Sequence, residues 1–377
     1  MACCLFIPTY WSTETLQSWK VFDHPSSITE EGTLGRTLDN LQHIGFSDHI
    51  MVLPAPCTPE ISQKVETICH AYDLPVTVCT PDLLVSLTDA LGKAGLSVSD
   101  RVLIGSDSYG GVRNIGLAYA ALHGYDQIIM IDDDECISPD YKTRALAHIG
   151  ERYKGKMILG KDGCVEDKNG RKTYDGQKGP WGSQWPKDEL FNAQIQQYLD
   201  ARESIMESTL GFGGNMVIDQ RLFANVPFDP FVNRGEDDDY LLNCSYRGFS
   251  FFFDKDLVLL HLPPERAKAF WSRQRQDIVR FLYVREKLRL MGIPRESLGG
   301  FMEYFTGPDL ERKAVCSSID AAQRFMDTDH FECNGFMENA KAAVCADAGK
   351  LKANSEAFLR LMDVWRGVMT TICGGTE

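Results

Sequence analysis

The chain has 377 residues, of which 44% are hydrophobic and 24% charged, and its 39 Lys and Arg against 53 Asp and Glu give a net charge of −14. This is the composition of an ordinary globular protein, so it excludes a largely disordered or collagen-like chain. The excess of acidic residues repels phosphate polymers and argues against a general nucleic-acid-binding protein.

The amino terminus predicts neither a signal peptide nor a membrane anchor. Its first residues carry no basic stretch, and the opening apolar run stops at Pro8. Nowhere does the sequence approach the roughly 18 uninterrupted apolar residues of a membrane span. We therefore expect a cytoplasmic protein whose 12 cysteines stay thiols and mostly fill small spaces in the core.

The first half of the chain alternates strand-like and helix-like segments. Strand patterns are found at residues 5–10, 49–53, 76–79 and 128–131, and helical spacing of apolar residues at 34–44, 60–72 and 111–124. Such alternation predicts βαβ units. We therefore expect an α/β fold with a mostly parallel sheet covered by helices on both faces.

The second half is less regular. Residues 160–190 are rich in Gly, Lys, Asp and Trp with weak periodicity, which predicts a long loop. After it we expect a glycine turn and strand ending at 218, a helix opening at 234–239 and two short strands within 249–261. From 264 onward the pattern is helical to the end, with the longest amphipathic runs at 268–291 and about 340–371.

The strongest chemical signal is the run Asp132, Asp133 and Asp134, which follows the predicted strand 128–131. The carboxyl ends of strands in open α/β sheets are where ligands bind. Adjacent carboxylates repel one another unless a cation or several N–H groups compensate them. Mg²⁺ or Mn²⁺ would do so, and a helix cap or a solvated acidic turn is an equally weighted alternative.

A second acidic run spans residues 236–239. The helix dipole favours acidic residues in a first helical turn, so a purely structural role explains part of this run. A carboxylate in this position can also act as a general base that removes a proton from an attacking hydroxyl.

His261 follows an apolar strand, where a single histidine is more often a core residue than a ligand. The two acidic runs change that balance, because the sequence has no paired cysteines or HExxH motif that would bind a metal elsewhere. His261 is therefore the predicted nitrogen ligand of a carboxylate metal site.

A basic stretch reverses the sign of the chain locally. Its members are Arg266, Lys268, Arg273, Arg275, Arg280, Arg285, Lys287 and Arg289. A solvated helix face accounts for its last part, whereas Arg273 or Arg275 could make bidentate contacts with a diphosphate.

Taken in order, five segments resemble the metal-dependent, nucleotide-sugar-using glycosyltransferases of the GT-A fold, and among them the large family 2. These segments are 7–10 (IPTY), 111–118 (GVRNIGLA), 131–134 (IDDD), 213–218 with 228–231 (GGNMVI and FDPF), and 235–240 (GEDDDY). His261 falls where many of these enzymes keep a metal-binding histidine, and the resemblance covers about residues 4–285. Five motifs in the family's order are more specific than any one of them.

The resemblance implies a GT-A fold, a divalent cation (Mn²⁺ or Mg²⁺) and a nucleoside-diphosphate sugar, UDP- or GDP-linked, as donor. It implies that Asp134 and His261 bind the metal, that Asp132 contacts the ribose or sugar, and that Asp237 is the base, with Glu236 beside it. The donor site that it implies also includes Pro8, Thr9, Arg113, Asn114 and Asp133. Gly214 and Asn215 would border the acceptor, and a single displacement would invert the anomeric configuration.

The resemblance also predicts how the chain is divided. Residues 1–290 would form the catalytic domain, with a nucleotide-sugar-binding half at 1–135 and an acceptor-binding half at 136–265. Residues 291–377 would form a helical extension that matches nothing in the family. Within the 160–190 loop, Trp181 and Trp185 are expected to offer flat faces to an acceptor sugar, although packing of the loop explains them equally well.

One motif departs from the family. The second strand usually ends in an Asp-Gly-Ser turn that reads the nucleobase, whereas residues 53–56 here are LPAP, so the base is not predicted. A sugar nucleotidyltransferase is a weaker alternative because residues 8–12 lack its Gly-rich basic loop. A non-catalytic carbohydrate-binding protein is the other alternative. The acceptor would be soluble, or met at a membrane surface by the basic stretch.

Overall fold

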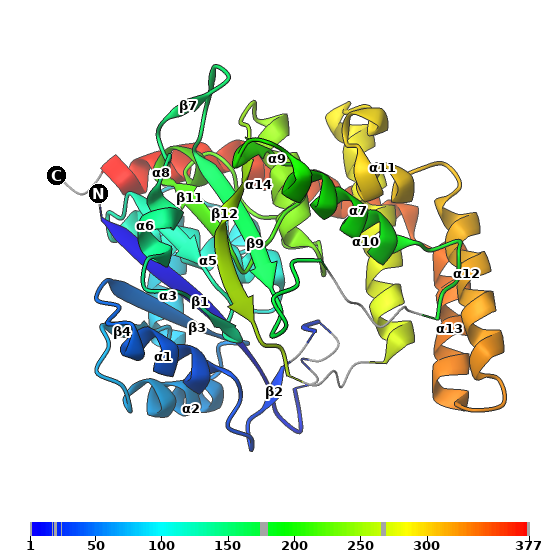
Figure 1. The fold of residues 1–377 in the computed structure, drawn as a ribbon, viewed down its shortest axis with the longest axis horizontal. Helices are drawn as coiled ribbons and strands as arrows, with labels where there is room; N and C mark the ends of the chain where they lie inside the picture. Colours follow the sequence, from blue (N-terminus) through cyan, green and yellow to red (C-terminus); the bar gives the residue numbers. More distant parts are fainter. Residues whose placement is uncertain are drawn as a thin grey trace.

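The computed structural model describes residues 2–16, 18, 21–23, 25–173, 180–264 and 269–374. Its centre is a mixed, mostly parallel sheet with the strand order β10-β12-β9-β11-β5-β1-β3-β4, to which β2 and β6 are added (Figure 1). The strands of this sheet are β1 (Cys3–Ser12), β2 (Ser26–Ser27), β3 (His49–Ala55), β4 (Val76–Val78), β5 (Gln127–Met130), β6 (Glu135–Cys136), β9 (Gly160–Glu166), β10 (Ile205–Glu207), β11 (Met216–Asp219) and β12 (Phe252–His261).

The parallel half of the sheet agrees with the predicted βαβ units. Strands β5, β1, β3 and β4 run parallel, and β11 then enters antiparallel between β5 and β9. Side chains alternate between the two faces because successive strand residues point in opposite directions. Leu5 and Ile7 of β1 face one apolar cluster, and Cys4 and Phe6 face another.

Helices cover both faces. One face is covered by α1 (Leu34–His43), α2 (Pro59–Cys69) and α6 (Tyr141–Leu146). The other is covered by α3 (Pro81–Lys93), α5 (Tyr109–Leu122) and the long α14 (Ala348–Gly374). The arrangement is the predicted α/β fold with helices on both sides of the sheet.

A second body of helices packs beside the sheet, on the right of Figure 1. It comprises α7 (Lys187–Asp200), α10 (Phe270–Met291), α11 (Gly300–Phe305), α12 (Leu310–Phe325) and α13 (His330–Val344). Helix α9 (Glu236–Tyr246) contributes to both this apolar cluster and the one behind the sheet. The remaining short elements are α4 (Val98–Arg101), β7 (Arg152–Tyr153), β8 (Lys156–Met157), α8 (Gln220–Phe223) and the 3₁₀ turn Arg295–Ser297.

The long loop predicted at 160–190 is partly wrong. Its first part is strand β9, buried between β11 and β12, and α7 begins at Lys187. The polar residues of this segment gave no apolar strand pattern in the sequence. One of them, Lys161, is nevertheless completely buried, because its Nζ lies 2.7 Å from Asp254 of β12. Likewise, the two short strands expected within 249–261 are one strand, β12, whose register shifts between Asp254 and Val258. Residues 174–179 lie outside the described part.

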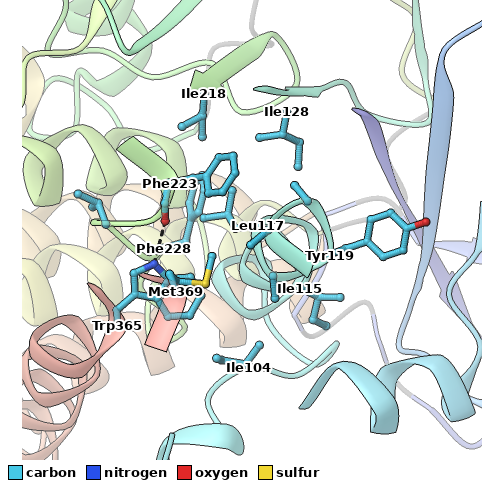
Figure 2. Close-up of a cluster of buried hydrophobic side chains, with 14 of the residues drawn as sticks. Ile104, Ile115, Leu117, Tyr119, Ile128, Ile218, Phe223, Phe228, Trp365 and Met369 are labelled. Atoms are coloured by element: carbon cyan, nitrogen blue, oxygen red, sulfur yellow. Dashed lines mark hydrogen bonds between the residues drawn. The ribbon is translucent and has the colours of Figure 1, made fainter. Parts of the chain in front are cut away.

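The helical end of the chain packs onto both bodies. The boundary predicted at 290 falls within the last turn of α10, and α14 returns behind the sheet to cover α5 (Figure 1). Trp365 of α14 is fully buried there, and its indole N–H donates to the Phe223 carbonyl at 2.8 Å (Figure 2). Among the described residues, no helix is long and apolar enough to cross a membrane.

Candidate functional site

The acidic turn, residues 132–135, follows the carboxyl end of β5 and is held by hydrogen bonds from two threonines. Thr9 of β1 donates to the Asp133 carboxylate at 2.5 Å. Thr37 of α1 donates to the carbonyls of Asp133 and Glu135 at 2.8 and 2.9 Å. These bonds turn Asp133 into the body of the protein, so it supports the turn and does not face a ligand.

His261 reaches this turn through the sheet. Strand β6 pairs antiparallel with the end of β12, which sets His261 opposite Glu135. His261 Nε2 then lies 3.3 Å from Asp134 Oδ2, and the Leu262 amide donates to the Asp134 carbonyl. The structure therefore brings together the two side chains predicted as metal ligands.

Glu135 is a site residue that the sequence reasoning missed. Its Oε2 accepts a hydrogen bond from the Asp132 amide at 2.6 Å, and the residue is buried. A Cβ at Gly214 would lie 2.3 Å from Glu135 Oε1, so any other residue at position 214 would push the Glu135 carboxylate out of place. The signal was present in the sequence, because Glu135 directly extends the acidic run.

Burial and mutual repulsion keep protons on this turn. Burial, and then the charge of Asp134, raise the pKa of Asp133 from its ordinary value to about 8. Burial raises the pKa of Glu135 well above its usual range, and the charges of Asp132 and Asp134 raise it further. A cation bound here would displace those protons.

Arg113 of α5 joins the two acidic runs. Its Nη2 lies 2.9 Å from Asp132 Oδ1 and its Nε 3.5 Å from Glu236 Oε1. The guanidinium is buried, and its Nη1 has no hydrogen-bond partner among the residues that the structure describes. Arg113 therefore lies beside the acidic turn, and its predicted contact with the donor stays a prediction.

The second acidic run occupies the first turn of α9, where most of its members have partners. Asp238 pairs with Arg280 at 2.9 Å, and Asp239 pairs with Lys287, whose ammonium also contacts Asp229 at 2.8 Å. Burial, and then the Asp237 charge, raise the pKa of Glu236 to about 8. The helix begins after Gly235, which has a φ of 71° and lies against the Arg280 guanidinium.

Asp237 is placed differently. Its Oδ2 accepts a hydrogen bond from the Gly213 amide at 3.0 Å, and no salt bridge to it is found among the described residues. It borders two adjoining cavities. Glu236 and Asp238 also line the first of these cavities, and Asp237 is the member of this run that lines both.

The two cavities share a wall. The Arg280 cavity, about 260 Å³, is also lined by Arg113, Lys187 and Arg234. The His261 cavity, about 360 Å³, is also lined by Glu135 and Lys172. Both are bordered by Asp132, Phe191, Phe212, Gly213, Gly214 and Asp237. Lys187, Arg234 and Arg280 lie outside the sequence-based site prediction.

Some predicted site residues act within the protein framework. The Asn114 side chain exchanges two hydrogen bonds with the backbone of Phe228. The Asn215 side chain accepts from Tyr141 and donates to the carbonyls of Cys164 and Leu257. Pro8 lies inside β1, opposite Leu53 of β3. The two asparagines are fully buried, and neither they nor Pro8 lines either cavity.

The structure corrects the prediction for the two tryptophans. Trp181 and Trp185 are 7% and 1% exposed and belong to the apolar cluster of the helical body. The Trp185 ring packs 4.6 Å from that of Phe305. Packing, the alternative reading, is what is observed, because both indoles are enclosed by α10 and its neighbours.

The basic stretch is also placed differently from the diphosphate-binding prediction. Arg275 Nε donates to Asn339 of α13 at 2.6 Å, and Arg273 is buried in α10. Arg285 and Arg289 pair with Glu311 and Glu286. The described part of this stretch therefore points into the helical body or is neutralised, while residues 266 and 268 lie outside the described part.

Comparisons with known proteins give distant similarities of fold. No protein-family model and no curated protein sequence matches the chain. A mannosyltransferase from Pyrobaculum calidifontis, in complex with GDP-Man and Mn²⁺, is 13% identical over 97% of this chain and 86% of its own, with a TM-score of 0.49.

Two further solved structures are similar over 78% of this chain, each with a TM-score of 0.41. Glucosyl-3-phosphoglycerate synthase from Mycobacterium tuberculosis, in complex with Mn²⁺, UDP and phosphoglyceric acid, is 15% identical and covered over 79% of its length. Mannosyl-3-phosphoglycerate synthase from Rubrobacter xylanophilus is 14% identical and covered over 75%.

Proposed function

We propose that this protein is a glycosyltransferase that moves a sugar from a nucleoside-diphosphate donor to an acceptor hydroxyl. The observation that carries the proposal is the position of Asp237. It lies in the wall shared by two cavities, together with Asp132 of an acidic turn whose repulsion calls for a cation. A donor and an acceptor that meet at this wall would place the acceptor hydroxyl at a carboxylate.

The two candidate metal ligands, Asp134 and His261, suit Mg²⁺ or Mn²⁺. Asp134 and His261 supply one oxygen and one nitrogen ligand, and no third protein ligand completes a cluster among the described residues. Such ions commonly take few protein ligands and fill their other positions with water and phosphate oxygens. A cation held by Asp134 and His261 would supply positive charge next to the leaving diphosphate.

The chain's own residues would bind and orient the substrates. Arg113 has a buried Nη1 without a protein partner, so it can donate to a donor oxygen while Nη2 keeps Asp132 in place. The Gly213 amide orients Asp237. Asp237 would take the proton of the acceptor hydroxyl as the hydroxyl attacks the anomeric carbon from the face opposite the diphosphate, which inverts the configuration.

Thermal unfolding in the presence of nucleotide sugars tests this proposal. Saturating UDP- or GDP-linked sugar with Mn²⁺ should stabilise the chain, by about 2.7 kcal/mol at a hundred times the Kd. Asp134→Asn should remove the part of the stabilisation that depends on Mn²⁺. Asp140→Asn is the matched control, because Asp140 is an exposed aspartate that pairs with Arg144 away from both cavities.

Two outcomes would contradict the proposal. Stabilisation by none of the donors, with or without metal, would make the acidic turn a structural feature. Equal loss of stabilisation in Asp134→Asn and Asp140→Asn would show that the effect does not arise at the turn.

A further inference from the structure

Two strand-to-helix junctions of this chain have nearly the same sequence. Residues 57–60 are Cys-Thr-Pro-Glu and residues 79–82 are Cys-Thr-Pro-Asp. In each, the threonine caps the helix by accepting from the amide three residues later, and the proline opens the helix. Each cysteine therefore comes directly before the amino-terminal end of a helix, α2 or α3.

The sheet brings these two cysteines together. Strands β3 and β4 are parallel neighbours, so their carboxyl ends and the junctions that follow lie side by side. The Cys57 sulfur lies 3.2 Å from the Cys79 carbonyl oxygen and 3.6 Å from Ser62 Oγ. The Cys79 thiol itself donates to the Thr80 carbonyl at 3.8 Å.

The two thiols differ in their exposure to solvent and in the direction in which their pKa values are shifted. Cys57 is partly exposed, whereas Cys79 is fully buried. Interaction with the Cys79 side chain lowers the pKa of Cys57, and the same interaction, followed by burial, raises the pKa of Cys79. The thiolate is the reactive form of cysteine, and Cys57 is the member of the pair that solvent reaches, so Cys57 would be the nucleophile.

We propose that Cys57 and Cys79 form a redox-active pair that closes to a disulfide when a peroxide reaches Cys57. The Cys57 thiolate attacks a peroxide oxygen, the O–O bond breaks, and the leaving oxygen takes up a proton, which leaves a sulfenic acid on Cys57. The Cys79 sulfur then attacks the Cys57 sulfur, the S–O bond breaks, and hydroxide leaves with the Cys79 proton as water. Two thiols lose two electrons and the peroxide gains them.

This inference goes beyond the proposed transfer reaction and does not depend on it. The pair lies at the carboxyl edge of the sheet, and the Cys57 amide donates to Ser106 in the segment that leads into α5. The bond would tie the start of α2 to the start of α3. Its formation can be followed without any nucleotide sugar.

The test uses the full chain, reduced, freed of reductant and treated with hydrogen peroxide. Mass spectrometry of the intact chain and of peptides prepared without reduction should show the loss of two hydrogens and one peptide pair that joins residues 57 and 79. Dithiothreitol should reverse the change. Cys69→Ser is the matched control, because Cys69 is a buried cysteine of α2, and this variant should still form the bond.

Single variants separate the steps. Cys57→Ser should abolish the linked peptide, and Cys79→Ser should leave a Cys57 sulfenic acid that dimedone traps. A wild-type chain in which Cys57 stays reduced, or is oxidised to the sulfinic acid while Cys79 remains a thiol, would overturn the proposal. The wild-type peptide map decides this even where a variant folds poorly.

Discussion

The acidic turn at 132–135 and the first turn of α9 each carry four consecutive carboxylates, yet the protein treats them in different ways. In α9, Asp238 and Asp239 have buried cationic partners. In the acidic turn, Arg113 contacts Asp132 and His261 contacts Asp134. Burial and the charge of Asp134 raise the pKa of Asp133. The same composition therefore builds a framework in one place and a cation-demanding surface in the other.

The largest effect expected from this difference is on the rate of sugar transfer. Asp237→Asn should lower the rate of sugar transfer by about 10²- to 10⁴-fold, because the amide cannot take the acceptor proton. Donor binding should remain, since Asp237 is not a predicted metal ligand. Single-turnover kinetics with the donor that stabilises the chain would measure the rate. A variant with near wild-type turnover would remove Asp237 from the mechanism.

Breaking the framework of α9 should cost stability instead. Lys287→Met leaves Asp229 and Asp239 buried without their shared cation, so the free energy of unfolding should fall by about 3–5 kcal/mol. Urea denaturation followed by circular dichroism would measure it. Lys341→Met, at an exposed lysine of α13, is the control and should change little. Equal stability of the two variants would contradict the framework role.

The packing of Trp185 in the helical body leads to a third prediction. Trp185→Ala should lower the free energy of unfolding by about 3 kcal/mol, because it empties a packed site between Phe281 and Phe305. Its effect on the KM for the acceptor should be small in the variant that remains folded. A large rise in KM with little loss of stability would support the original prediction that Trp185 offers a flat face to an acceptor sugar.

The smallest effect concerns pH. The folded chain keeps a proton on Asp133 up to about pH 8, whereas the unfolded chain releases it near pH 4. Unfolding therefore releases a proton between these values, and the Asp133 contribution to stability falls as pH rises through that window.

Urea denaturation from pH 5 to pH 8 would measure this trend. Asp133→Asn should flatten it, since the amide does not titrate. An unchanged pH dependence in this variant would mean that Asp133 does not carry the proton.

The sequence predicted the parallel half of the sheet because its apolar strands and amphipathic helices each follow one period. The resemblance also paired Asp134 with His261 as metal ligands, and the two side chains do lie together in the structure. The sequence could not predict β9, whose buried Lys161 depends on a partner 93 residues away. Nor could it separate Arg280, which lines a cavity, from Arg275, because the face that each helix residue presents is set by tertiary packing.

Helix α14 has a consequence for the order of folding. Strand β1 occupies the middle of the sheet, but α5 behind it is covered by Phe358, Trp365 and Met369, which are translated long after β1 and α5. Until Ala348 and the residues after it have left the ribosome, the nascent chain carries an uncovered apolar layer. The βαβ units around β1 must therefore wait for α14 before this layer of their core is closed.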